Sequence, residues 1–201
     1  MKKSLGAKTI LYPTPVLVVG SYDAEGRANV MTAAWGGIAC SKPPCVAVSL
    51  RSATASHGNL VSRKAFTISL PDEGHAAQAD YFGIASGRDQ DKFEVSGLTA
   101  VRSDLVDAPY VAEFPFVLEC RVVAVHELGL HTQFVGEILD VKVDEAALGA
   151  DGRVDLARLR PILFAPDQQA YHAVGAFVGK AFSIGRAIGD RGAASSPGGK
   201  A

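Results

Sequence analysis

The chain of 201 residues has few cysteines, almost no net charge and no long hydrophobic run. Its three cysteines, Cys40, Cys45 and Cys120, are odd in number. Their spacing fits neither a disulfide framework nor the short C-x-x-C pattern of zinc and redox-dithiol sites. We therefore expect three small, buried apolar residues in an intracellular, cytoplasmic protein.

The net charge of -1 and the pI near 6.5 provide no basic surface for nucleic acid or for an acidic membrane. No window approaches the ~20 apolar residues of a membrane-spanning helix, and the N-terminal lysines precede no signal-peptide run. A G-x-G-x-x-G fingerprint and a P-loop are also lacking. The sequence thus predicts no nucleic-acid partner and no membrane partner.

The most informative region of the sequence is residues 28–57. Two apolar segments, residues 28–35 and 45–50, are predicted strands joined by a Gly/Ser/Lys/Pro connection. Small residues follow the first segment, so either a flat ligand approaches the backbone there or the chain makes a tight barrel corner. The second segment runs into R-S-A-T-A-S-H at residues 51–57, where a helix over residues 54–64 is predicted to begin.

This strand-to-helix junction is chemically suited to a phosphate group. A helix start carries backbone N–H groups without partners and a dipole that favours an anion. Hydroxyls and the planar guanidinium of Arg51 add donors. The residues fit equally an ordinary capped helix, in which Thr54 is the N-cap.

Further strands are predicted at residues 16–22, 65–70, 98–102, 114–128 and 131–143, and a weak helix at 75–84. With about seven or eight short strands separated by turn signals, we expect a mainly β fold, a Greek-key-like antiparallel barrel with a few short helices. Gly136 predicts a bulge or close packing in the last long strand. The charged side chains of the final hairpin are expected on its solvent side: Glu119, Arg121, Glu137, Asp140 and Lys142.

Two polar or irregular regions complete the chain. Residues 86–94 are predicted as a solvated loop that Phe93 pins to the core. Residues 168–188 form an arm that packs either on its own domain or on a second copy, with Tyr171, Phe177 and Phe182 as anchors. Residues 189–201 contain no large apolar side chain and are predicted to be a disordered tail. We therefore expect one domain, residues 1–188.

Six motifs stand in one order: P-T-P-V-L-V-V (13–19), N-V-M-T-A-A-W (29–35), S-K-P-P-C-V-A-V-S-L-R (41–51) with T-A-S-H (54–57), F-T-I-S-L-P (66–71), S-G-R-D-Q-D-K-F (86–93) and L-G-L-H-T-Q-F-V-G-E-I (128–138). This series resembles the flavin reductase-like family, and within it the flavoredoxin-type members. The resemblance implies a split β-barrel that binds FMN, usually as a homodimer.

The resemblance also implies a set of site residues. The FMN phosphate would lie at the strand-to-helix corner, with Ser49, Leu50, Arg51, Thr54, Ser56 and His57. The isoalloxazine ring would lie along Asn29, Val30, Met31, Thr32, Ala33, Ala34 and Trp35. Ser86, Lys92 and Phe93 would approach from the polar segment, and a cation such as Lys92 would stabilise the charge of reduced flavin.

His131 is the implied catalytic residue, close to the ring where a nicotinamide would stack. Many reductase members have G-D-H at this turn, whereas this chain has Gly129-Leu130-His131, so the tautomer of His131 stays open. The alternative for this histidine is a purely structural role.

Three functions are compatible with these residues. The first is an enzyme that transfers hydride from NAD(P)H to flavin. The second is a flavoredoxin-like electron carrier that keeps FMN bound, exchanges electrons with protein partners and needs no nicotinamide site. The third is a binding module on the same barrel without redox chemistry.

Overall fold

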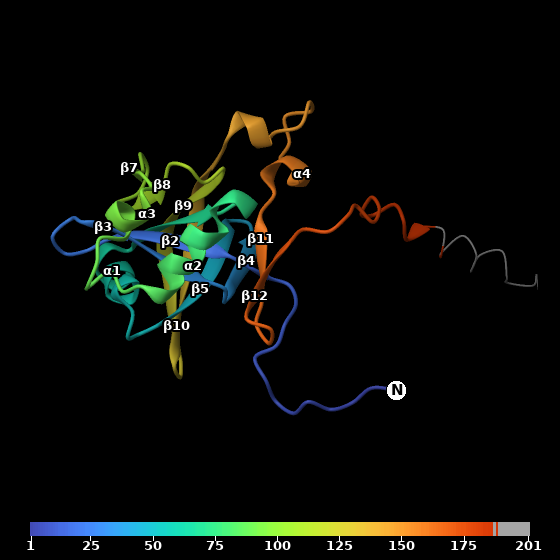
Figure 1. The fold of residues 1–201 in the computed structure, drawn as a ribbon, viewed down its shortest axis with the longest axis horizontal. Coiled ribbons are helices and arrows are strands. Elements are labelled where there is room, and N and C mark those ends of the chain that lie inside the picture. The colour runs from blue at the N-terminus through green and yellow to red at the C-terminus, as the bar shows by residue number, and fades with distance from the viewer. Residues whose placement is uncertain (187, 189–201) are drawn as a thin grey trace, which may run out of the picture.

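The computed structural model describes residues 1–186 and 188, and a seven-stranded antiparallel sheet dominates them (Figure 1). The strand order is β3-β2-β6-β9-β10-β5-β4. This arrangement confirms the prediction of a mainly β, antiparallel fold. In chain order the strands are β2 (Leu17–Tyr22), β3 (Ala28–Ala33), β4 (Gly36–Ser41), β5 (Pro44–Arg51), β6 (Ala65–Leu70), β9 (Phe116–Leu128) and β10 (His131–Val143).

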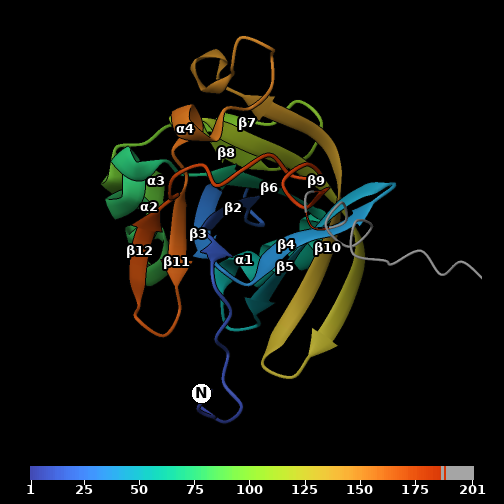
Figure 2. The same cartoon turned by 90° about the vertical axis from the view of Figure 1, so that its right-hand side faces the viewer.

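The sheet curls on itself, as Figure 2 shows, so that its two terminal strands approach each other. These strands, β3 and β4, are consecutive in the chain. The backbone N–H of Ser49 in β5 donates to the carbonyl of Trp35, which follows β3, at 2.8 Å. This bond ties the end of β3 to the opposite side of the sheet.

Strand β2 is buried on both faces, which explains its unbroken apolar sequence. On one face Leu17 and Val19 join the core inside the barrel, which also holds Phe66 and Phe134. On the other face Val18 joins a second core with neighbours from the helices and the smaller sheets. The two cores thus fix β2 and its partner β3 from both sides.

Short elements cover the outside of the barrel. Strands β1 (Thr14–Pro15), β11 (Ile162–Ala165) and β12 (Ala170–Ala173) form one small sheet, and β7 (Ala100–Arg102) pairs with β8 (Pro109–Val111). The helices are α1 (Ala55–Arg63), α2 (Ala76–Ile84), α3 (Lys92–Ser96) and α4 (Leu156–Leu159), with 3-10 turns η1 (Glu73–His75) and η2 (Glu145–Ala147). No helix within residues 1–186 is long and apolar enough to cross a membrane.

Two sequence-based boundaries were wrong. The Gly/Ala/Cys-rich stretch after Trp35 was predicted as a connection, but it forms β4, because β5 supplies a hydrogen-bonding partner along its length. The polar segment 86–94 is a loop only as far as Asp91, whose side chain caps α3 by accepting from the N–H groups of Phe93 and Glu94. Phe93 is buried in the second core, as predicted.

Gly136 lies at a bulge between β9 and β10, which confirms that prediction. A Cβ atom at this position would stand 2.5 Å from Cζ of Phe66, so the barrel core leaves no room for a side chain. The bulge and the close packing therefore occur together.

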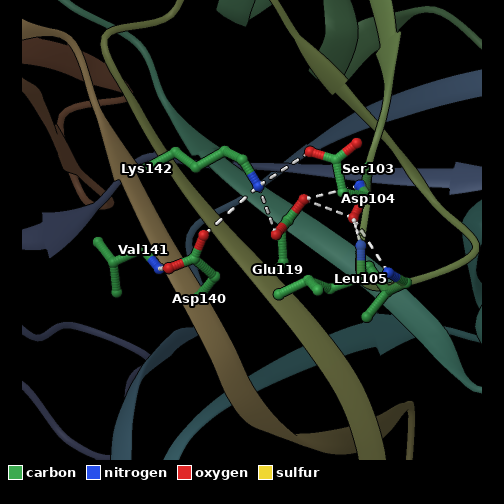
Figure 3. Close-up of polar contacts among 8 residues, drawn as sticks. Ser103, Asp104, Leu105, Glu119, Asp140, Val141 and Lys142 are labelled. Atoms are coloured by element: carbon green, nitrogen blue, oxygen red, sulfur yellow. Dashed lines mark hydrogen bonds and ion pairs between the residues drawn. The ribbon is translucent and has the colours of Figure 1, made fainter.

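Glu119 was predicted on the solvent side of the last hairpin, and this was wrong, because the side chain is completely buried. Its carboxylate accepts from Ser103 Oγ at 2.5 Å and from Lys142 Nζ at 2.6 Å (Figure 3). Burial opposes the charge on Lys142, but the hydrogen bonds and charges of Glu119 and Asp140 outweigh it and raise the Lys142 pKa. The loop through Ser103 and Asp104 covers this pair.

The predicted arm divides into two parts. Tyr171 of β12 packs against Phe164, and its hydroxyl donates to Asp80 of α2 at 2.9 Å. Beyond β12 the chain leaves the barrel (Figure 1), and Phe177 and Phe182 are 85% and 96% exposed. Only the first part therefore packs on its own domain. The predicted disordered tail, residues 189–201, lies outside the described residues.

Candidate functional site

Three segments that are far apart in the sequence enclose a hollow of about 180 Å³. Strand β3 forms one wall, the start of α1 another, and the end of α2 with the loop towards α3 the third; all three helices contact β3. The hollow brings together part of the predicted flavin set, namely Asn29, Met31, Thr54, Ser56, Ser86 and Lys92.

Asn29 of β3 is the central polar side chain of this hollow. Its Nδ2 donates to Ser56 Oγ at 2.9 Å, and both residues are buried. Its Oδ1 is also buried, yet it accepts no hydrogen bond from any residue that the structure describes. Gly87 packs closely against this oxygen, because a Cβ there would stand only 1.9 Å from it. A buried acceptor without a donor is costly in a folded protein, so this atom suits a ligand that donates a hydrogen bond.

Lys92 brings a positive charge to the same hollow. The side chain is only 3% exposed, and its Nζ donates to the carbonyls of Val30 and Phe82 at 2.8 Å each. None of the ion pairs among the described residues includes Lys92. Burial lowers the Lys92 pKa from 10.5 to about 8. An anion in the hollow would favour the charged ammonium.

The start of α1 is the capped helix that the sequence allowed. Thr54 is the N-cap, and its Oγ1 accepts from the His57 N–H at 3.3 Å while donating to the Arg51 carbonyl at 2.9 Å. The threonine hydroxyl is therefore already engaged. The N–H groups of Ala55 and Ser56 remain as donors, and the first turn of α1 contains no acidic residue to oppose an anion.

Arg88 was not predicted from the sequence as a site residue. Its Nη1 donates to the Ala53 carbonyl at 2.7 Å, which ties the loop after α2 to the turn before α1. The guanidinium has further N–H donors next to the helix start. Its position inside the S-G-R-D-Q-D-K-F motif was the available signal, but a charged loop residue is usually solvated.

The other predicted residues do not line the hollow. Val30, Ala33, Leu50 and Phe93 have side chains in the two cores, so they could meet a ligand only through their backbone. Thr32 Oγ1 donates to the Ala79 carbonyl, and Ala34 is half-buried after β3. Ser49 and Arg51 share one face of β5, away from the core residues Val48 and Leu50.

His57 belongs to a hydrogen-bond chain that the sequence did not reveal. Thr132 Oγ1 donates to Glu127 Oε2 at 2.9 Å and also lies 2.9 Å from His57 Nε2. Because the threonine hydroxyl has a single proton and donates it to Glu127, Nε2 of His57 must donate to the hydroxyl oxygen. This series of hydrogen bonds therefore keeps a proton on Nε2. The His57 ring also meets Phe134 edge-on, with ring centroids 5.4 Å apart.

His131, the predicted catalytic residue, lies at the first position of β10, half-buried and directly opposite Arg51 of β5. It does not line the hollow around Asn29. Trp35 faces a larger groove of about 890 Å³. The rest of that groove is lined by residues 7–10, Phe164 and residues 166, 167 and 169. The groove beside Trp35 and the hollow around Asn29 share no lining residue.

Comparisons with known proteins agree with this architecture. Residues 9–172 match the model of the flavin reductase like domain. The flavoredoxin of Desulfovibrio vulgaris is 53% identical, with a TM-score of 0.89 over 92% of this chain and 100% of its own. The flavoredoxin of Methanosarcina acetivorans is 28% identical, with a TM-score of 0.87 over 94% and 100%.

A protein with a split barrel domain from Shewanella frigidimarina is 21% identical, with a TM-score of 0.77 over 86% of this chain and 87% of its own, and it shares the fold. These likenesses confirm the prediction of a flavin reductase-type split barrel.

Proposed function

Because the chain belongs to the flavin reductase-like family, we propose that it binds FMN and serves as a flavoredoxin-like electron carrier. One observation carries this proposal: an unpaired buried acceptor, Asn29 Oδ1, and a buried cation, Lys92, line the same hollow. A ligand that both donates hydrogen bonds and takes on negative charge satisfies both groups. The 53% identity to a flavoredoxin supports the choice of a carrier.

The residues present suit the parts of FMN. Asn29 Oδ1 would accept from a flavin N–H or a ribityl hydroxyl. The N–H groups of Ala55 and Ser56, with the Arg88 guanidinium, would hold the phosphate. When bound, FMN would supply reversible electron uptake. Lys92 would then stabilise negative charge gained by the cofactor, because no carboxylate among the described residues neutralises it.

The hollow of about 180 Å³ is smaller than the roughly 300–1,000 Å³ of typical small-molecule sites. It adjoins a second hollow of about 480 Å³, which shares Asn29, Ala55 and Gly87 with it and is also lined by Arg88. FMN would extend across both, with its phosphate towards Arg88. The second hollow is bordered by exposed residues such as Glu25 and Asp89, so the cofactor would stay accessible to a redox partner, as a carrier requires.

FMN titration of the flavin-free protein, followed by flavin fluorescence, tests the site. Asn29→Leu should weaken binding about fivefold or more, because a hydrogen bond worth about 1 kcal/mol or more is lost. Gln78→Leu is the matched control, since Gln78 Oε1 is also a buried acceptor without a partner among the described residues, but Gln78 does not line the hollow. Equal affinities for the two variants would contradict the placement of FMN.

Hydride transfer from NAD(P)H is the second candidate, and the groove beside Trp35 favours it by offering room for another ligand. Anaerobic addition of NADH and then NADPH to the FMN-loaded protein separates the two functions. A flavin absorption band that persists with both nucleotides supports the carrier. Bleaching by either nucleotide, with turnover, would establish the reductase instead.

We also propose that the protein is a homodimer in which the exposed end of the arm, Phe177 to Phe182, packs on the second copy. Phe177, Val178 and Phe182 are each at least 85% exposed, which is unusual for side chains of this size. Sedimentation analysis of the full chain should show a dimer that Phe177→Ser with Phe182→Ser dissociates. A monomeric parent protein, or a variant that stays dimeric, would contradict this proposal.

A further inference from the structure

Cys40 and Cys45 face each other across the hairpin of β4 and β5, where their Cα atoms are register partners. Directly opposite residues of an antiparallel pair have Cα atoms about 4.5–5.5 Å apart and side chains on the same face. A disulfide needs a Cα separation of about 4.4–6.8 Å. The backbone thus already holds these two residues at a spacing that permits a bond.

The two thiols differ in access to solvent. The prediction of three buried cysteines was wrong for Cys40, which is exposed, with its Sγ 3.4 Å from the Lys42 carbonyl. Cys45 is only 5% exposed; burial, with the nearby Cys40 and Glu137, raises its thiol pKa. A reagent from solution therefore meets Cys40 before the nearly buried Cys45.

Cys120 provides an internal comparison. It is completely buried in the barrel core, and burial raises its pKa to about 12. A thiol of this kind is inert towards reagents in solution. The chain therefore contains one accessible thiol, one buried partner opposite to it, and one unreactive thiol.

We propose that Cys40 and Cys45 form a thiol–disulfide site that exchanges with low-molecular-weight disulfides. The Cys40 thiolate attacks a sulfur of the small disulfide, which forms a mixed disulfide and releases one thiolate. The Cys45 thiolate then attacks Cys40 Sγ, which closes the Cys40–Cys45 bond and releases the second thiolate. Overall, two protein thiols are oxidised and one small disulfide is reduced to two thiols.

The position of the hairpin makes this closure feasible. Strand β4 is a terminal strand of the sheet, so it can shift towards β5 without breaking bonds to a neighbour on its other side. The enclosed turn contains only Ser41, Lys42, Pro43 and Pro44. This inference does not depend on flavin binding.

The test is incubation of the full reduced chain with excess oxidised glutathione, followed by intact-mass analysis and tryptic mapping. Arg27 and Arg51 bound one tryptic peptide that contains both cysteines, since trypsin does not cleave the Lys42–Pro43 bond. We expect this peptide to lose two hydrogens and to retain no glutathione. This measurement needs no variant.

Variants then separate the two steps of the exchange. Cys45→Ala should retain a stable glutathione adduct on Cys40, and Cys40→Ser should not react at all. Cys120→Ser should behave as the parent protein does. The proposal is overturned if the parent keeps an adduct, shows no reaction, or forms a bond that includes Cys120 or a second chain.

Discussion

Replacing Lys92 by methionine should change how the stability of the flavin-free protein depends on pH. Lys92 is buried, and its ammonium has two carbonyl acceptors but no carboxylate partner. Burial alone lowers its pKa from 10.5 to about 8. Methionine has a similar length and no charge, so the variant removes the titration while filling much of the same space.

The sign follows from proton binding. Between the folded pKa of about 8 and the unfolded value of 10.5, the unfolded chain binds more protons at this position. Stability from this group is therefore fully present above pH 10.5 and is lost as the pH falls through about 8. With ~1.4 kcal/mol for each pKa unit, Lys92 should add about 2.5 kcal/mol to the free energy of unfolding between about pH 7 and about pH 10.

Urea denaturation at a series of pH values measures this effect. The useful quantity is the free energy of unfolding of the parent minus that of Lys92→Met, and it should rise with pH by the stated amount. Cys120 and Tyr171, whose pKa values are raised to about 12, destabilise both proteins in alkali, so the subtraction removes them. Lys3→Met, at an exposed lysine, is the control and should leave the pH dependence unchanged.

A difference that stays flat from about pH 7 to about pH 10 would refute the reasoning, because Lys92 would then titrate alike in both states. A difference that falls with pH would mean that the folded protein stabilises the ammonium. Either result would also contradict the proposed role of Lys92 in binding an anion in the hollow.

Two substitutions test the site and the buried ion pair. Gly87→Ala places a Cβ 1.9 Å from Asn29 Oδ1, so the amide must move, and FMN affinity in a fluorescence titration should fall by about tenfold or more. Lys142→Met leaves the buried Glu119 carboxylate without its cation, and urea denaturation near neutral pH should show a loss of roughly 3 kcal/mol.

Both predictions have matched controls. Gly37→Ala adds a methyl group in open space on β4 and should leave FMN affinity unchanged. Arg121→Met breaks the exposed pair with Glu137 and should cost less than about 1 kcal/mol. If Gly37→Ala lowered FMN affinity as much as Gly87→Ala, the explanation given for Gly87 would be wrong. The same holds for Lys142 if Arg121→Met lowered the free energy of unfolding as much as Lys142→Met.

Local sequence patterns were sufficient for several of the regular elements. The predicted bounds of β6 and β10 coincide with those observed, and Thr54 caps α1 as its residue type suggested. Gly26 takes a positive φ of 81° in the turn between β2 and β3, a conformation that glycine adopts without a steric penalty. These features depend on neighbouring residues, which a sequence displays directly.

The sequence was misleading where contacts outside a segment decide its structure or its burial. Strand β4 contains Ile38 as its one strong strand former among small residues, and its pairing with β5 makes it a strand. Glu119 looks like a surface residue of an alternating strand until Lys142 and the loop at Ser103 cover it. In both cases a contact made outside the segment decides the outcome.

The chemistry of the candidate site divides in the same way. The residue types, a hydroxyl-rich helix start and a lysine in a polar segment, were visible in the chain. Only the tertiary structure places Asn29 against Ser56, Arg88 against Ala53, and Lys92 beneath β3. The sequence determines which side chains are present. Their burial arises only when the segments pack together, and this burial lowers the pKa of Lys92 and leaves the oxygen of Asn29 unpaired among the described residues.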